Sequence, residues 1–146
     1  MQHLLFRVGA EIFAIPADDI DAVLPVPKLE HLAHGPDHFV GLLRHHGRLV
    51  PVLDVNVLQG QASCRPVIST RILLVRSAEG ALGLLVEQAM EMMDLRSPQV
   101  LPSELLVKDQ NWLTPEIFDT ELGLVQSVRW QSLLTPEWQA LAIEEG

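Results

Sequence analysis

Short apolar segments alternate along this chain with turns that contain glycine, proline or charged residues. The pattern predicts β-strands joined in hairpins, because each segment is too short for a stable helix and ends at residues that favour turns. About eight short strands are expected from this pattern. They occupy residues 4–8, 12–15, 39–43, 49–53, 71–75, 82–86, 112–118 and 122–125, and a further strand is expected over residues 90–95.

Two segments follow a helical spacing instead. Ile20, Val23 and Leu24 are spaced as i, i+3 and i+4, which predicts a helical turn that ends at Pro25. Near the C-terminus, the Thr-Pro-Glu sequence at residues 135–137 supplies a capping residue and a first-turn proline. A terminal helix is therefore predicted to begin there.

The predicted strands are joined by short turns, and no regular helices separate them. This arrangement favours closed antiparallel β-barrels over a sheet built from alternating strands and helices. Residues 71–75 and 82–86 are nearly continuous aliphatic segments, as expected for strands buried on both faces. The chain is thus predicted to be mainly β, with residues 1–146 forming one ordinary domain or two very small lobes that share a core.

Composition narrows the possible functions. The chain has 10 Lys and Arg against 19 Asp and Glu, a net charge of −9, which opposes nucleic-acid binding and favours a partner with a basic surface. Cys64 is the only cysteine, so an internal disulfide is excluded and a reducing compartment is expected. The N-terminus lacks a signal-peptide pattern, and the apolar stretches fall far short of the roughly 20 residues that span a bilayer. A cytoplasmic location is expected.

Catalytic signatures are missing from the sequence. It has no glycine-rich phosphate loop, no nucleophile elbow and no zinc-protease motif. Cys64 lies in a polar loop with no sign of activation, so the chain is not expected to be an enzyme or to carry a cofactor.

The histidines leave one alternative open. His31, His34 and His38 recur at helix-like intervals, and two more histidines are adjacent at residues 45–46, which suggests a metal- or ligand-binding barrel with a sensing role. However, a Gly-Pro pair at residues 35–36 interrupts any helix that would align the first three. Polar loop histidines are the favoured interpretation, and no metal site is expected.

Four motifs, in order along the chain, resemble those of the CheW-like family, the coupling proteins of bacterial chemosensory arrays. Residues 6–16 are similar to the family's opening hairpin, with glycine and an acid in the turn. Residues 39–54 resemble its most recognisable signature, a strand, a glycine turn and an aliphatic strand with Val-Pro that ends in Asp. Residues 82–87 match a glycine-aliphatic-Val-acid strand, and residues 133–137 the start of the last helix.

This resemblance implies two intertwined five-stranded SH3-like barrels with a shared hydrophobic core and a C-terminal helix. It also implies a non-catalytic adaptor without a cofactor. Family members bridge the cytoplasmic tip of a chemoreceptor and the regulatory domain of a CheA-type histidine kinase. Preformed barrel surfaces suit such docking, because little ordering accompanies binding.

The matching motifs imply two sets of contact residues. The receptor-binding set is Ile20, Val23, Gly41, Arg44, His46 and Gly47. The kinase-binding set is expected on the other barrel and comprises Leu84, Val86 and Glu87. The alternative for the receptor set is a purely structural role in the core or in a turn. The alternative for Glu87 is a position at a strand end that only faces solvent.

Two positions depart from the family pattern. The turn before Gly47 typically carries Asn-Leu-Arg-Gly, and here His46 takes the place of the arginine. Histidine is shorter and largely neutral at pH 7, so it cannot replace a guanidinium group. Ala22 stands where an acid is frequent. These changes imply a receptor other than that of standard chemotaxis, or a weaker contact, and favour an accessory chemosensory pathway.

Overall fold

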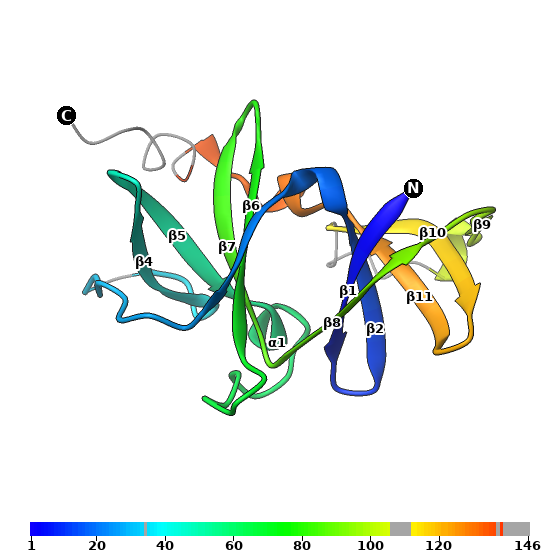
Figure 1. The fold of residues 1–146 in the computed structure, drawn as a ribbon, viewed down its shortest axis with the longest axis horizontal. Coiled ribbons are helices and arrows are strands. Elements are labelled where there is room, and N and C mark those ends of the chain that lie inside the picture. The colour runs from blue at the N-terminus through cyan, green and yellow to red at the C-terminus, as the bar shows by residue number, and fades with distance from the viewer. Residues whose placement is uncertain (34, 106–111, 137, 139–146) are drawn as a thin grey trace.

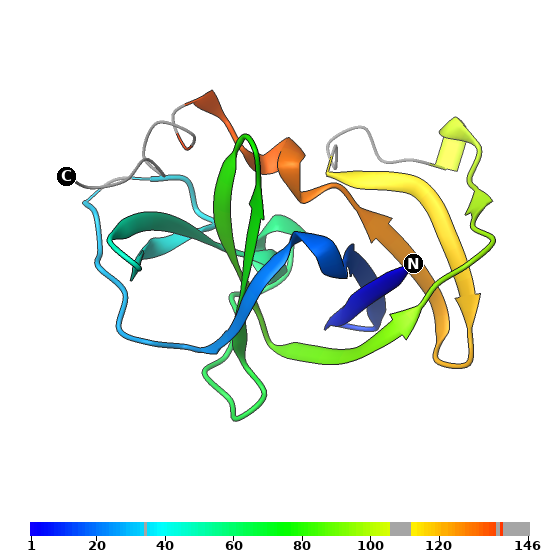
Figure 2. The same cartoon turned by 45° about the horizontal axis from the view of Figure 1, so that its top comes forward.

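The computed structural model describes residues 1–33, 35–105, 112–136 and 138, and within them the chain forms two β-sheets. In chain order the strands are β1 (Gln2–Val8), β2 (Glu11–Pro16), β3 (Ile20–Pro25), β4 (Phe39–His45), β5 (Arg48–Asp54), β6 (Arg71–Ser77), β7 (Gly80–Val86), β8 (Gln88–Asp94), β9 (Gln99–Val100), β10 (Leu113–Thr120) and β11 (Gly123–Val128). The short helices are α1 (Val55–Leu58) and the 3-10 turns η1 (Ala17–Asp19), η2 (Ser103–Leu105) and η3 (Trp130–Leu133). The sheets lie side by side in both ribbon views (Figures 1 and 2).

The first sheet has six strands in the order β8-β1-β2-β11-β10-β9. β1 and β2 form the expected hairpin, closed by the pair Val8↔Glu11, and β8 lies antiparallel on the other side of β1. β11 pairs in parallel with β2, so strands from the two ends of the chain meet in the middle of this sheet. Long-range pairing therefore unites the first and last parts of the sequence.

The second sheet has five strands in the order β3-β6-β7-β5-β4. The hairpins β4–β5 and β6–β7 are joined by a parallel pairing of β5 with β7. β3 lies at one edge beside β6, and β4 lies at the other edge beside β5. This sheet is built from one continuous stretch of the chain, which is enclosed between the two parts of the first sheet.

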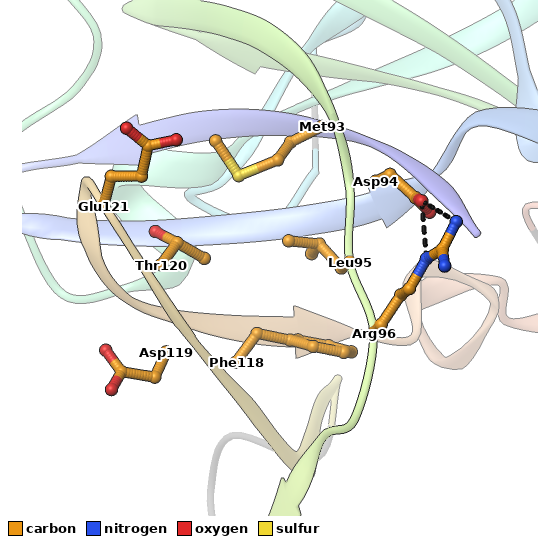
Figure 3. Close-up of a pocket in the computed structure, with 8 residues that line it drawn as sticks. All are labelled: Met93, Asp94, Leu95, Arg96, Phe118, Asp119, Thr120 and Glu121. Carbon is orange, nitrogen blue, oxygen red and sulfur yellow. Dashed lines mark hydrogen bonds and ion pairs between the residues drawn. The ribbon is translucent and has the colours of Figure 1, made fainter.

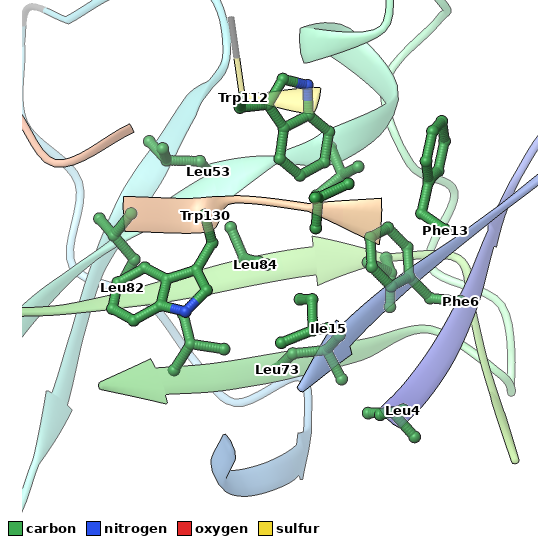
Figure 4. Packing of buried hydrophobic residues seen from close by; sticks show 14 of the residues in the cluster. Leu4, Phe6, Phe13, Ile15, Leu53, Leu73, Leu82, Leu84, Trp112 and Trp130 are labelled. Atoms are coloured by element: carbon green, nitrogen blue, oxygen red, sulfur yellow. The ribbon is translucent and has the colours of Figure 1, made fainter. Parts of the chain in front are cut away.

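A shared core fills the space between the two sheets (Figure 4). Phe6, Phe13 and Ile15 enter it from the first sheet, and aliphatic residues of β5, β6 and β7 enter it from the second. Trp112 and Trp130 complete the cluster, and both are almost fully buried. Each buried indole N–H has an acceptor, because Trp112 donates to Gln59 Oε1 at 2.8 Å and Trp130 to Asp19 Oδ2 at 3.0 Å.

The structure confirms the mainly β class predicted from the sequence and corrects several details. Both sheets contain a parallel pair, and the first has a sixth strand, the two-residue β9. The helical turn predicted from Ile20, Val23 and Leu24 is wrong. These residues form β3, because backbone pairing with β6 satisfies their polar groups and leaves alternate side chains partly buried. The predicted C-terminal helix lies largely outside the described residues.

No helix among the described residues is long and apolar enough to cross a membrane.

Candidate partner-docking site

The predicted receptor-contact residues lie on the second sheet, at β3 and at the β4–β5 hairpin. On β3 the side chains alternate between partly buried and exposed positions. Ile20 packs against the shared core, whereas Val23 is 44% exposed. Because β3 is at the end of its sheet, its outer edge offers backbone groups and an apolar side chain to a partner.

The second sheet curls so that its two edges approach one another. Ala22 and Leu24 of β3 pack on the same buried cluster as Val40 of β4. The charge of Asp21 on β3 also acts on His45 at the end of β4. The β3 edge and the end of β4 therefore lie within electrostatic reach of one another.

The turn between β4 and β5 is a two-residue hairpin loop. His45 pairs with Arg48, and the central residues His46 and Gly47 both have positive φ, 51° and 77°. Two positive φ angles are the requirement of a type I′ turn, for which Asn-Gly and Asp-Gly are the preferred sequences. His46 is thus an exposed side chain held in a defined turn, and Gly47 serves the backbone geometry.

Gly41 and Arg44 attach the β4–β5 hairpin to the segment that follows β3. A Cβ at Gly41 would lie 2.9 Å from the backbone oxygen of Glu30, so only glycine allows this close approach. Leu42 and Glu30 exchange backbone hydrogen bonds of 2.7 and 2.9 Å at the same point. Arg44 forms an ion pair of 3.1 Å with Glu30, and both side chains are about half exposed. Gly41 is therefore a packing residue, while Arg44 remains accessible.

Burial and desolvation lower the pKa of His45 below its usual value, and the adjacent His46 lowers it further. The two imidazole rings are 4.1 Å apart in an edge-to-face arrangement. His45 is therefore neutral at pH 7, and the turn carries no positive charge from it.

The predicted kinase-contact residues require two corrections. They lie on β7 or directly after it, in the same sheet as the receptor set rather than on the other barrel. Leu84 and Val86 are fully buried in the shared core, so their side chains pack the interior and do not face a partner. A continuous aliphatic strand is buried on both faces when it lies inside a sheet between two others, as β7 does between β5 and β6.

Glu87 is the member of the kinase set that reaches the surface, with 21% of its side chain exposed. Its carboxylate accepts a hydrogen bond of 2.7 Å from Asn56 Nδ2 and pairs with Arg65 Nε at 3.0 Å. Its backbone oxygen accepts a 2.6 Å hydrogen bond from Ser69. Glu87 therefore fastens the loop between α1 and β6 to the end of β7.

A buried carboxylate that the sequence interpretation did not single out holds the other end of this loop. Asp54, only 4% exposed, caps α1 by accepting hydrogen bonds from the backbone N–H groups of Asn56 and Val57. Its second oxygen accepts the backbone N–H of Cys64 at 2.9 Å. An aspartate placed directly after a strand and before a short helix is a capping signal, so the cap of α1 was predictable from the sequence. The hydrogen bond from Cys64 joins residues ten positions apart and was not predictable in this way.

Burial, followed by the hydrogen bond to Asp54, raises the pKa of the Cys64 thiol to about 12. The thiol is therefore protonated at neutral pH and donates to Asp54 Oδ1 at 3.2 Å. Cys64 contributes to loop structure rather than to nucleophilic chemistry. Among the described residues, no group of three or more His, Cys, Asp or Glu side chains is placed to hold a metal ion. One of the predicted candidates, His34, lies outside the described residues.

The family model described as "CheW-like domain" matches residues 2–117 of the sequence. The chain belongs to the CheW-like family. It is 22% identical over 138 residues to the chemotaxis protein CheW of Helicobacter pylori, covering 94% of this chain and 84% of that protein. It is also 21% identical over 102 residues to the chemotaxis protein CheW of Klebsiella aerogenes, covering 70% and 61% of the two chains.

A solved CheW structure has the same fold. The scaffolding protein TtCheW of Thermoanaerobacter tengcongensis superposes with a TM-score of 0.79 at 17% identity, over 94% of this chain and 89% of that one. CheW-like family membership places the chain among the scaffold and adaptor proteins of chemotaxis, a family that is not enzymatic. The departures at Ala22 and His46 lie on β3 and in the β4–β5 turn, where Ala22 is partly buried and His46 is exposed.

Proposed function

We propose that this chain is a non-catalytic cytoplasmic adaptor that couples the cytoplasmic tip of a chemoreceptor to the regulatory domain of a CheA-type histidine kinase. The observation that carries the receptor side is the preformed face at the curled second sheet. There the free edge of β3 and the rigid β4–β5 turn lie close together. Membership of the CheW-like family supports a kinase as the second partner in this proposal.

On the receptor side, each predicted residue has a separate task. Val23 supplies the exposed apolar contact, and Ile20 supports it from the core. Arg44 and His46 offer the polar contacts, while Gly41 and Gly47 give the hairpin its shape. His46 in place of a family arginine lacks a guanidinium group, which weakens attraction to a carboxylate and so selects a different receptor tip.

On the kinase side, the proposal now rests on Glu87 and the loop that it holds, since Leu84 and Val86 are buried. A loop fastened at both ends meets a partner with little loss of conformational freedom. This adaptor acts by placing two proteins beside one another, which requires affinity at two faces and no reacting group.

The receptor face is tested by co-purification with a receptor fragment. Val23→Asp should reduce receptor binding at least tenfold, because it puts a charge into an apolar contact. The matched control is Val100→Asp, which places the same charge on an exposed valine of the first sheet. Equal binding by the two variants would remove β3 from the proposed interface.

The turn is tested separately. His46→Arg should strengthen binding to a standard receptor tip, and His46→Glu should weaken binding to the native receptor. His46→Asn is the control, because it keeps the turn geometry and adds no charge. If binding to both receptors is unchanged in all three variants, the turn does not contact the receptor.

A further inference from the structure

A small polar cavity lies between the β1–β2 hairpin and the loop that joins α1 to β6. Its volume is about 310 Å³, at the small end of the roughly 300–1,000 Å³ that ligand pockets occupy. Its lining comes from the end of β1 and the turn that follows, from α1, from the loop, and from the junction of β7 with β8. This cavity is called the Asn56 pocket below, after its most buried side chain.

Asn56 brings an unsatisfied hydrogen-bond acceptor to the lining of this pocket. The residue is only 5% exposed, and its Nδ2 donates to Glu87 Oε2 at 2.7 Å. Because a carboxylate only accepts hydrogen bonds, this contact fixes which end of the amide is the oxygen. That oxygen, Oδ1, is buried and has no hydrogen-bond partner within the described part of the chain. A buried carbonyl oxygen without a donor is costly, so binding of an N–H or O–H group at this point is favoured.

Arg7 gives the Asn56 pocket a positive charge that no acid balances. The carboxylate of Glu87 is already engaged by Asn56 and by Arg65 Nε at 3.0 Å. Arg7 is partly buried, and among the described residues it has no ion-pair partner. The pocket therefore has two arginines against one acid in a chain whose net charge is −9. Guanidinium groups suit a carboxylate or a phosphate, and they disfavour a metal cation.

The rest of the lining is polar as well. Gln61 and Gln88 each bring an exposed amide that can donate and accept. Gln61 lies against the β1–β2 turn, where a Cβ at Gly9 would be 2.6 Å from its Nε2, so glycine leaves room for this amide. None of the described residues that line the pocket has an aromatic or aliphatic side chain. An apolar ligand would bury no apolar protein surface here, whereas a ligand with oxygens on every side would meet polar partners.

The larger hollow of the first sheet lacks these features (Figure 3). It lies between the end of β8 and the β10–β11 turn and has a volume of about 520 Å³. Its Asp94 already pairs with the N-terminal amine and with Arg96, each at 2.7 Å. Two buried side-chain atoms of the described residues lack a hydrogen-bond partner, and neither belongs to a residue that lines this hollow. An unsatisfied buried acceptor therefore distinguishes the Asn56 pocket from the larger hollow.

We infer that the Asn56 pocket binds a small hydroxylated anion, either a hydroxycarboxylic acid or a sugar phosphate. The carboxylate or phosphate of this ligand pairs with Arg7, and one of its hydroxyl groups donates to Asn56 Oδ1. Arg65 and the two glutamine amides meet its remaining oxygens. This inference goes beyond the adaptor role and does not rest on it, because the purified chain alone makes every contact.

Isothermal titration calorimetry of the full chain tests the ligand class, with citrate and glucose 6-phosphate as the probes. At least one should bind with a Kd below about 1 mM and raise the melting temperature. Binding of citrate alone identifies a hydroxycarboxylic acid, and binding of glucose 6-phosphate alone identifies a sugar phosphate. Tricarballylate, which is citrate without its hydroxyl, and methyl phosphate, which lacks the sugar, should bind at least fivefold more weakly because Asn56 Oδ1 stays unpaired. Glucose, which has no anionic group, should not bind.

Matched arginine variants test the position of the anion. Arg7→Gln should weaken binding at least tenfold, whereas Arg129→Gln removes the same charge at an exposed residue outside the pocket and should not. Arg65→Gln, at a side chain that is 75% exposed, should also weaken binding and serves if Arg7→Gln does not fold. Failure of both probes to bind at about 10 mM would overturn the inference. So would equal binding by the arginine variants and the control, or by each probe and its analogue without the hydroxyl.

Discussion

Replacing Asp54 by asparagine tests whether this buried carboxylate holds together the polar network behind the α1–β6 loop. The substitution changes the shape of the side chain very little. Oδ1 of Asp54 accepts the backbone N–H groups of Asn56 and Val57, and Oδ2 accepts the N–H of Cys64 at 2.9 Å. Whichever way an asparagine is turned, its NH₂ group must face at least one of these donors.

The expected cost follows from that geometry. One charge-assisted hydrogen bond is lost and one buried N–H loses its acceptor, which together destabilise the fold by about 2–4 kcal/mol. This is a large fraction of the roughly 5–15 kcal/mol by which a domain is stable. If the free energy of unfolding falls by about 2 kcal/mol per molar urea, the urea concentration at the unfolding midpoint should fall by about 1–2 M.

Urea unfolding followed by tryptophan fluorescence measures this shift, because Trp112 and Trp130 are buried in the shared core. Asp21→Asn is the matched control. It makes the same chemical change in an exposed ion pair with Arg76, for which at most about 1 kcal/mol is expected. Equal midpoints for the two variants would refute the assignment of Asp54 as the buried anchor of the loop.

Three further predictions concern the β4–β5 turn and the thiol. His46→Asn should raise stability by about 0.5–1 kcal/mol in urea unfolding, since asparagine tolerates positive φ better than histidine; a loss of stability would contradict the turn assignment. In an NMR titration, His45 should have a midpoint below 6.5 that rises when His46 is removed. The pKa of His45 is lower in the folded chain than in the unfolded chain. Its small contribution to stability is therefore present above pH 6.5 and is lost as the pH falls through the folded-state pKa. Iodoacetamide at pH 8 should modify Cys64 at least a hundredfold more slowly than an unfolded control, because a pKa of about 12 leaves almost no thiolate. Ordinary reactivity would show that the thiol is not buried against Asp54.

Local patterns predicted most of the strands correctly. The glycine turns and aliphatic segments located the hairpins β1–β2, β4–β5 and β6–β7, because these depend on neighbouring residues. β3 was mistaken for a helical turn because Ile20, Val23 and Leu24 follow the i, i+3, i+4 spacing, although Ile20, Ala22 and Leu24 also alternate as a strand requires. Only the distant partner β6 decides between them. The two parallel pairings also join segments far apart in sequence and left no local signal.

In the candidate site too, local sequence predicted some features, whereas those that depend on distant residues were not predicted. Family motifs selected Val23, Arg44 and His46, which lie at exposed positions of β3 and the β4–β5 hairpin, and their contact with a receptor stays a prediction. The sequence could not show whether Leu84 and Val86 are buried or exposed, because an aliphatic segment is typical both of a core strand and of an apolar docking surface. The loop network around Glu87 depends on side chains from three separate segments and was not predictable from local sequence.

The parallel pairing of β2 with β11 has a consequence for how the protein is made. As the chain leaves the ribosome, the strands β3 to β7 form a continuous stretch that can pair as soon as residue 86 has emerged. β1 and β2 appear first, yet they must wait for β11, which ends at residue 128. Until then the edge of β2 that β11 will cover stays unpaired, and a message truncated before β11 yields a finished second sheet carrying an unclosed first one.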